Sequence, residues 1–277
     1  MAYEDFTLLR VEVDGRVCRV TIDNPPINLL DVPLMLELDR LSREAASDPD
    51  VGVVVVGSAN PDFFVAHADV GAILQLPREA LHEPPDELGF FHAMVDRFRT
   101  MPVATIAVVE GVARGGGCEL ASSFDVRVAA RGRAVFGQPE ALVGIIPGGS
   151  GTQRLPRLVG RARALEIVLG GADVDADTAD RWGLVNRALP PDEVWPFVDA
   201  LAARIASLPA VVVAEAKASV AAAEPDPVPG LLAEWQRFTR CLADPEAAAR
   251  MERFLASGGQ TPGVERQPIT LADGAWT

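Results

Sequence analysis

The chain has 277 residues, of which 49% are hydrophobic and 23% charged, a composition typical of one globular domain with a smaller appendage. Its formal net charge of −14 would repel an extended polyanion, so we expect no nucleic acid partner. The three cysteines are far apart and form no CxxC pair, and no run of 18 apolar residues or signal-type N-terminus occurs. We therefore expect a cytoplasmic protein with no membrane partner.

The first elements in chain order are extended. Thr7–Val13 and Arg16–Ile22 alternate apolar and polar residues across Asp14-Gly15, which predicts a β-hairpin. Leucines at helical spacing predict a helix over Pro33–Ala46, and the wholly apolar run Val51–Val56 predicts a buried strand.

The next segment, Leu76–Gly89, contains three prolines and several acidic residues but little apolar material. Such a composition predicts a mobile surface loop. Its position directly after Ala66–Val70 makes it a candidate lid, with an inert insertion as the alternative.

Two further apolar strands are predicted at Ala104–Val109 and Val126–Ala130, each followed by a helical pattern. Strands that are buried on both faces and alternate with helices favour an α/β fold of stacked ββα-type units over a two-layer sandwich. From Pro191 onward the pattern is helical, with segments at about 192–207, 209–223, 228–242 and 244–256. We predict a core domain over residues 1–195, a helical C-terminal domain over 196–258, and an extended tail over 259–277.

The stretch Ile106–Asp125 combines a buried strand, the three glycines Gly115, Gly116 and Gly117, and a helix start. Glycines let a ligand approach the backbone, and the first N–H groups of a helix are unpaired and favour negative charge. This arrangement suits a developing oxyanion. The alternative is a tight strand–helix connection with Glu119 as a capping residue.

A second glycine-rich stretch, Phe136–Thr152, contains Glu140. Two glutamates in otherwise apolar, glycine-rich segments, Glu119 and Glu140, are candidates for a general acid and base with shifted pKa values. The alternative is two ordinary solvated carboxylates.

At these residues the chain resembles the crotonase family, also called the enoyl-CoA hydratase/isomerase family. The resemblance extends from about Phe6 to Phe254 and depends on three ordered motifs: VVEGVARGGGCELASSFDVRVAA, FGQPEALVGIIPGGSGTQRLPRLVG and GLVNRALP. It implies a crotonase-like spiral of repeated ββα units with a C-terminal α-helical appendage. It also implies an acyl-CoA or enoyl-CoA substrate, no separate cofactor because coenzyme A is part of that substrate, and a homotrimer or homohexamer.

The resemblance also assigns a site. The amides of Ala66 and Gly116 would form an oxyanion hole, and Glu119 and Glu140 would be the catalytic acid and base. Substrate-binding residues would be Leu29 and Gly116 with the loop Ala66, His67, Ala68 and Asp69.

Because both acids are present, we favour syn addition of water to a 2-enoyl-CoA. Double-bond isomerisation, acyl-CoA hydrolysis and lyase chemistry are alternatives within the family. A non-catalytic acyl-CoA binder is a third possibility, from a different functional class.

His67 stands where the family usually has glycine, at a position that can require a positive φ. If the loop keeps the family path, we expect the imidazole at the mouth of the acyl pocket, where it would restrict the substrate. A changed path would instead remove the Ala66 amide from the oxyanion site. His67, His82 and His92 show no metal-type spacing, so we expect no metal site.

Overall fold

The computed structural model of the chain describes residues 3–272. Its strands are β1 Leu9–Asp14, β2 Val17–Ile22, β3 Val53–Ser58, β4 Phe63–Val65, β5 Ala104–Val109, β6 Val112–Arg114, β7 Val126–Ala130, β8 Val135–Gly137, β9 Val174–Asp175 and β10 Arg187–Leu189. Its helices are α1 Val32–Ser47, α2 Val70–Ile73, α3 Phe90–Thr100, α4 Gly116–Ser122, the 3₁₀ helix η1 Pro139–Val143, α5 Gly151–Val159, α6 Arg161–Gly170, α7 Ala176–Trp182, α8 Pro191–Ala206, α9 Ala210–Ala221, α10 Val228–Leu242, α11 Pro245–Ala256 and α12 Pro262–Glu265.

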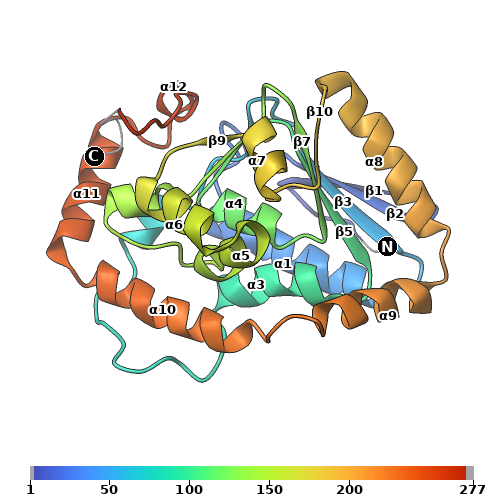
Figure 1. Cartoon of the computed structure of the whole chain (residues 1–277), viewed down its shortest axis with the longest axis horizontal. Helices are drawn as coiled ribbons and strands as arrows, with labels where there is room; N and C mark the ends of the chain where they lie inside the picture. Colours follow the sequence, from blue (N-terminus) through green and yellow to red (C-terminus); the bar gives the residue numbers. More distant parts are fainter. Residues whose placement is uncertain (1–2, 273–277) are drawn as a thin grey trace.

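The strands form two sheets, with the orders β1-β2-β3-β5-β7-β10 and β4-β6-β8-β9. Within the larger sheet only the β1–β2 pair is antiparallel, and β4, β6 and β8 are mutually parallel. Three times along the chain, two consecutive strands divide between the sheets: β3, β5 and β7 join the larger sheet, and the strands that follow them, β4, β6 and β8, join the smaller one. The chain therefore advances through repeated units, which confirms the predicted α/β spiral (Figure 1).

The N-terminal hairpin forms as predicted, with a different turn. Asp14 pairs with Val17, so the turn residues are Gly15 and Arg16 rather than Asp14 and Gly15. Gly15 has a φ of +55°, which glycine adopts without a steric penalty.

Strand β3 is buried on both faces, as its apolar run predicts. Val54 and Val56 belong to a core that also contains Leu34 of α1. Val53 and Val55 belong to a second core with Val194 of α8. Successive side chains of a strand point to opposite faces, so the sheet carries helices on both sides.

Helix α8 is continuous across the predicted boundary between residues 195 and 196. Val194 and Val198 both pack in the second core against the sheet, so α8 belongs with the core domain. Among residues 3–272, no single helix is long and apolar enough to cross a membrane; α8 and α9 reach that length and composition together but are bent by 107° at their break.

The predicted C-terminal helices are present, and α10 and α11 run back along the core (Figure 1). Phe238 of α10 and Met251 of α11 pack with Val70 of α2 and Val143 of η1. The segment after α11 is not the extended tail that we predicted. It contains α12, and Glu265 and Ile269 are buried. Residues 273–277 of the predicted tail lie outside the described residues.

The segment Leu76–Gly89 contains no helix or strand, which confirms the loop prediction. It is joined to α10 by three hydrogen bonds: the Leu81 amide donates to Thr239 Oγ1 at 3.0 Å, and the His82 carbonyl accepts from Gln236 Nε2 at 2.5 Å and from Arg240 Nη2 at 3.5 Å. Leu76 and Gly89, at its two ends, line the central cavity described next.

Candidate active site

A central cavity of about 330 Å³ lies between the core and the C-terminal helices. Its walls are mainly apolar and include Leu30, Met35, Ile73, Phe91, Ile145 and Trp235. Of the sequence-predicted residues, the cavity brings together Ala68, Asp69, Gly116, Glu119 and Glu140. Two larger hollows, of about 530 and 410 Å³, lie beside α9 and are lined by none of the predicted residues.

Gly115 and Gly117, which precede Glu119, are each required for a different structural reason. Gly115 has a φ of +47°, and an added Cβ there would lie 2.9 Å from Glu140 Oε1. An added Cβ on Gly117 would lie 2.1 Å from the carbonyl oxygen of Val65 on β4. Only glycine fits at these positions, so the motif lets α4 start directly against β4, and Glu119 in its first turn faces the cavity.

Two residues with unpaired backbone amides, Ala68 and Gly116, lie close together in the cavity wall. Gly116 is the first residue of α4, so its N–H has no acceptor within the helix. Ala68 is bridged to Leu30 through bonds made by its neighbours: the Leu30 amide donates to the His67 carbonyl and the Asp69 amide to the Leu30 carbonyl. The Ala68 N–H therefore turns away from Leu30. A Cβ added to Gly116 would lie only 3.3 Å from the Ala68 nitrogen.

The structure corrects the assignment of Ala66 as an oxyanion donor. Its amide already donates to the carbonyl of Ile27 at 3.2 Å, and Ala66 is fully buried behind the cavity. The Ala68 amide has no hydrogen-bond partner among the described residues, so it is the candidate donor from this loop.

The expectation that the His67 imidazole lies at the mouth of the acyl pocket is also wrong. Its side chain does not line the cavity but is buried beneath the loop, with 4% of the residue exposed. Nδ1 lies 2.7 Å from the Ala68 carbonyl, and Nε2 lies 3.2 Å from Glu265 Oε1. His67 does not have a positive φ, so the loop accommodates its Cβ without backbone strain.

The two remaining substrate-binding predictions have different outcomes. Asp69 lines the cavity and caps α2, accepting a hydrogen bond from the Gly71 amide at 2.8 Å. Leu29 is half-buried and packs with Ile27 and Phe63 instead. Its neighbour Leu30 lines the cavity.

The carboxylate of Glu119 is held by the glycine-rich loop that precedes α5. Its Oε1 accepts hydrogen bonds from the amides of Gly149, at 2.7 Å, and Gly151, at 2.8 Å. An added Cβ on Gly149 would lie 2.0 Å from Phe91 Cε1 and 2.6 Å from Glu119 Oε2, so glycine is required at this position.

The alternate amides of the same loop serve a third carboxylate, Glu234 of α10. Glu234 accepts from the Ser150 amide at 2.7 Å and the Thr152 amide at 2.9 Å. Ser150 has a φ of +110°, the conformation that reverses the direction of successive amides. His92, in the cavity wall, lies 2.9 Å from Glu234 Oε1 through Nε2.

Sequence reasoning missed Glu234 and His92. The available signal was the glycine cluster before α5, because the first amides of a helix need acceptors. Nothing in the sequence indicated that a glutamate far along the chain would be one of them.

Burial raises the pKa of Glu119 to about 8, and the charge of Glu234 adds to this effect while the amides of Gly151 and Gly149 oppose it. Burial also raises the pKa of Glu140 well above its usual range, with a further contribution from the charge of Glu119. Carboxyl groups that share one low-dielectric site do not readily ionise together. Both carboxyl groups therefore hold their protons more strongly than an ordinary glutamate, and the two amide hydrogen bonds to Glu119 favour its ionised form.

Residues 3–272 contain no group of three or more histidine, cysteine, aspartate or glutamate side chains arranged to hold a metal ion. The two buried histidines instead contact single carboxylates, His67 with Glu265 and His92 with Glu234.

Comparisons with known proteins agree with this geometry. Residues 12–256 match the family model described as enoyl-CoA hydratase/isomerase. The chain is 36% identical over 258 residues to the probable enoyl-CoA hydratase echA8 of Mycobacterium tuberculosis, covering 92% of this chain and 96% of that protein. It is 35% identical to the crotonyl-CoA hydratase of Syntrophomonas wolfei, with the same coverage.

A crystal structure from Streptomyces avermitilis, of a protein assigned as an enoyl-CoA hydratase, superimposes with a TM-score of 0.87 at 40% identity. The match covers 95% of this chain and 96% of that one. With two carboxyl groups and two unpaired amides in one cavity, and with these relatives over nearly its whole length, the chain belongs to the enoyl-CoA hydratase/isomerase family.

Proposed function

We propose that the protein is an enoyl-CoA hydratase that adds water to the C2–C3 double bond of a 2-enoyl-CoA thioester in the syn sense. The observation that carries the proposal is the placement of Glu119 and Glu140 in one apolar cavity with the amides of Ala68 and Gly116. Retention of both carboxyl groups favours hydration over reactions of the family that use one.

In this proposal the thioester carbonyl accepts hydrogen bonds from the Ala68 and Gly116 amides. Negative charge develops on this oxygen as C3 is attacked, and the start of α4 adds a favourable dipole. Loss of one such donor typically costs ~3–4 kcal/mol of transition-state stabilisation.

The different surroundings of the two carboxyl groups support different roles for them. Glu119 is the base, since two amides stabilise its charged form. Glu140 is the acid, because burial and the nearby Glu119 keep it protonated. Glu119 takes a proton from water, the water oxygen bonds to C3, the π electrons move toward the carbonyl, and Glu140 gives its proton to C2. A proton then returns from Glu119 to Glu140 through solvent before the next turnover.

The test uses crotonyl-CoA, whose conjugated absorbance disappears on hydration. Glu119→Gln and Glu140→Gln should each lower kcat by about 10²–10⁴-fold, the usual contribution of a general acid or base. Glu166→Gln, an exposed glutamate on α6, is the matched control and should retain normal turnover. Near-normal kcat in both cavity variants would contradict the proposal. Binding without turnover by the natural protein would favour the acyl-CoA binder.

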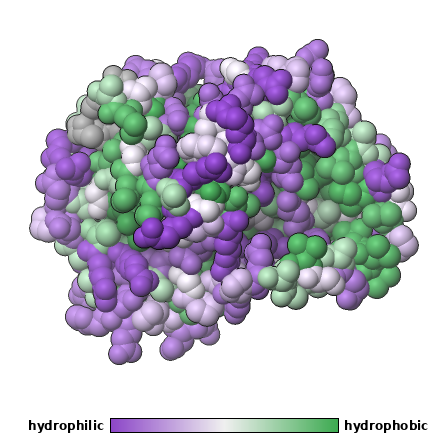
Figure 2. Space-filling model, in the orientation of Figure 1, coloured by the Kyte–Doolittle hydropathy of each residue, from purple (hydrophilic) through white to green (hydrophobic). Residues whose placement is uncertain are grey.

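We also propose that the chain works in the cytoplasm as a homotrimer or homohexamer. Around α9 the residues Leu208, Val211, Val212 and Val220 are exposed, and Figure 2 shows hydrophobic surface over this region. A second copy of the chain would cover such a surface. A mass near 29.4 kDa by light scattering at micromolar concentration would count against self-association.

A further inference from the structure

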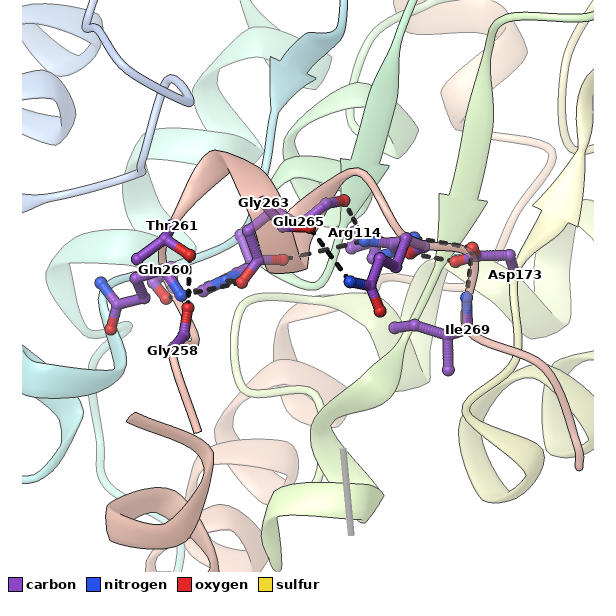
Figure 3. Close-up of polar contacts among 11 residues, drawn as sticks. Arg114, Asp173, Gly258, Gln260, Thr261, Gly263, Glu265 and Ile269 are labelled. Atoms are coloured by element: carbon purple, nitrogen blue, oxygen red, sulfur yellow. Dashed lines mark hydrogen bonds and ion pairs between the residues drawn. The ribbon is translucent and has the colours of Figure 1, made fainter. Parts of the chain in front are cut away.

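The C-terminal segment (residues 258–269) makes a set of polar contacts with Arg114 and Asp173 (Figure 3). Its Glu265 is fully buried, and the two side chains that it meets, His67 and Arg114, are 4% and 1% exposed. Burying charged and polar groups is costly unless each one is paired in good geometry. Glu265 meets this requirement through Oε1 and its backbone carbonyl, and its Oε2 lies 3.7 Å from Arg114 Nη1, so these contacts join the elements that carry them.

The first loop is held on both sides of Ala68. Before it, His67 Nε2 lies 3.2 Å from Glu265 Oε1. After it, Asp69 Oδ1 accepts a hydrogen bond from Gln260 Nε2 at 3.0 Å. The backbone N–H of Gln260 also donates to Glu265 Oε1 at 2.9 Å. The same carboxylate oxygen therefore contacts both His67 and Gln260, the two residues that hold the loop.

The second loop is held through Arg114, which ends β6 just before Gly115 and Gly116. Its Nη1 donates to the Glu265 carbonyl at 2.8 Å, and its Nη2 donates to the Gln267 carbonyl at 2.9 Å. Asp173 accepts two hydrogen bonds from the same guanidinium, from Nε to Oδ1 and from Nη2 to Oδ2, each at 2.7 Å (Figure 3).

Glu265 is the one residue of the segment that reaches both loops. Its side chain binds His67, and its backbone carbonyl binds Arg114. Burial alone would raise the pKa of Glu265, but the hydrogen bonds from His67 and Gln260 and the charge of Arg114 hold it below its usual value. The carboxylate is therefore ionised at neutral pH.

We propose that Glu265 is a positioning residue that sets the spacing between the Ala68 and Gly116 amides. The inference rests on the proposed function, in which one carbonyl oxygen must lie about 2.7–3.1 Å from both nitrogens. Because the two amides come from different loops, a contact common to both loops holds that spacing. The contribution appears mainly in the transition state, where the oxygen becomes negative.

The kinetic test compares Glu265→Ala and Glu265→Gln with Arg266→Ala. Arg266 is the neighbouring residue, but its side chain is exposed and contacts Asp62 and the Phe63 ring rather than either loop, so its loss should leave turnover unchanged. Glu265→Ala should lower kcat for crotonyl-CoA by about 10–100-fold with KM within about threefold, the pattern for an interaction made in the transition state.

The decisive measurement is spectroscopic. A conjugated aromatic enoyl-CoA absorbs at longer wavelength when its carbonyl is polarised, and this shift requires binding but no turnover. Glu265→Ala should bind the thioester with a smaller red shift than the natural protein or Arg266→Ala. A full red shift in Glu265→Ala would overturn the inference, even if kcat falls.

If Glu265→Ala does not fold, Glu265→Gln decides by the same measurement: a smaller shift supports the inference, and a full shift overturns it. If the natural protein shows the shift without hydrating crotonyl-CoA, the proposed function fails and the positioning role stands. No shift in the natural protein would overturn the inference, whereas turnover of crotonyl-CoA decides the proposed function separately.

Discussion

Replacing Gly116 by alanine tests the oxyanion site directly. The added Cβ would lie 3.1 Å from Leu30 Cδ2, 3.2 Å from Ala68 Cβ and 3.3 Å from the Ala68 nitrogen. The carbonyl oxygen of a substrate needs the same space, because it must lie about 2.7–3.1 Å from both amides. We expect the methyl group to displace the carbonyl from at least one donor, which corresponds to ~3–4 kcal/mol and a fall of about 10²–10³ in kcat.

The same substitution should leave the fold intact. Gly116 does not have a positive φ, and alanine is favoured over glycine in a helix by about 1 kcal/mol. The tight contacts cost a similar amount, about 1–3 kcal/mol. Thermal unfolding should therefore change little while hydration of crotonyl-CoA is lost. Gly263→Ala is the control, since its added Cβ would meet nothing within 4 Å. Turnover of Gly116→Ala within threefold of the natural enzyme would refute the reasoning.

Three further predictions concern the buried carboxyl groups and the glycine motif. The pH profile of kcat/KM should be bell-shaped, rising with pH through about 8 as Glu119 ionises and falling at higher pH as Glu140 loses its proton; a flat profile from pH 6 to 10 would contradict the assigned roles. The folded pKa of Glu119 exceeds its unfolded value, so its contribution to stability is lost as pH rises through about 8; Glu119→Gln should therefore unfold at a higher temperature than the natural protein at pH 8, with the difference shrinking toward pH 4.5. Gly117→Ala, whose Cβ would lie 2.1 Å from the Val65 carbonyl oxygen, should fail to give soluble folded protein, whereas normal expression and circular dichroism would show that the loop can move.

Local patterns were sufficient to predict most of the elements. Strands β5 and β7 have the predicted bounds, because each is a short, mainly apolar run that ends at a charged residue, Glu110 or Arg131. The C-terminal helices also follow from composition and from the prolines between them. The hairpin turn was displaced by one residue, since alternation alone does not fix the register.

The cavity was less predictable, because its details depend on contacts between distant residues. Glu119 and Glu140 could be selected from their glycine-rich surroundings. The choice between the amides of Ala66 and Ala68 depends on which one Ile27 occupies, and no pattern within the loop reveals this. The direction of His67 depends on Glu265, 198 residues away.

The alternating amides of the loop from Gly149 to Thr152 have a consequence for engineering. Because successive N–H groups bind Glu119 of α4 and Glu234 of α10 in turn, this loop and α10 form one exchangeable unit. A chimera that takes its C-terminal helices from a relative lacking a glutamate at position 234 would leave the Ser150 and Thr152 amides without acceptors. Substrate-range redesign by helix grafting should therefore transfer α10 together with this loop.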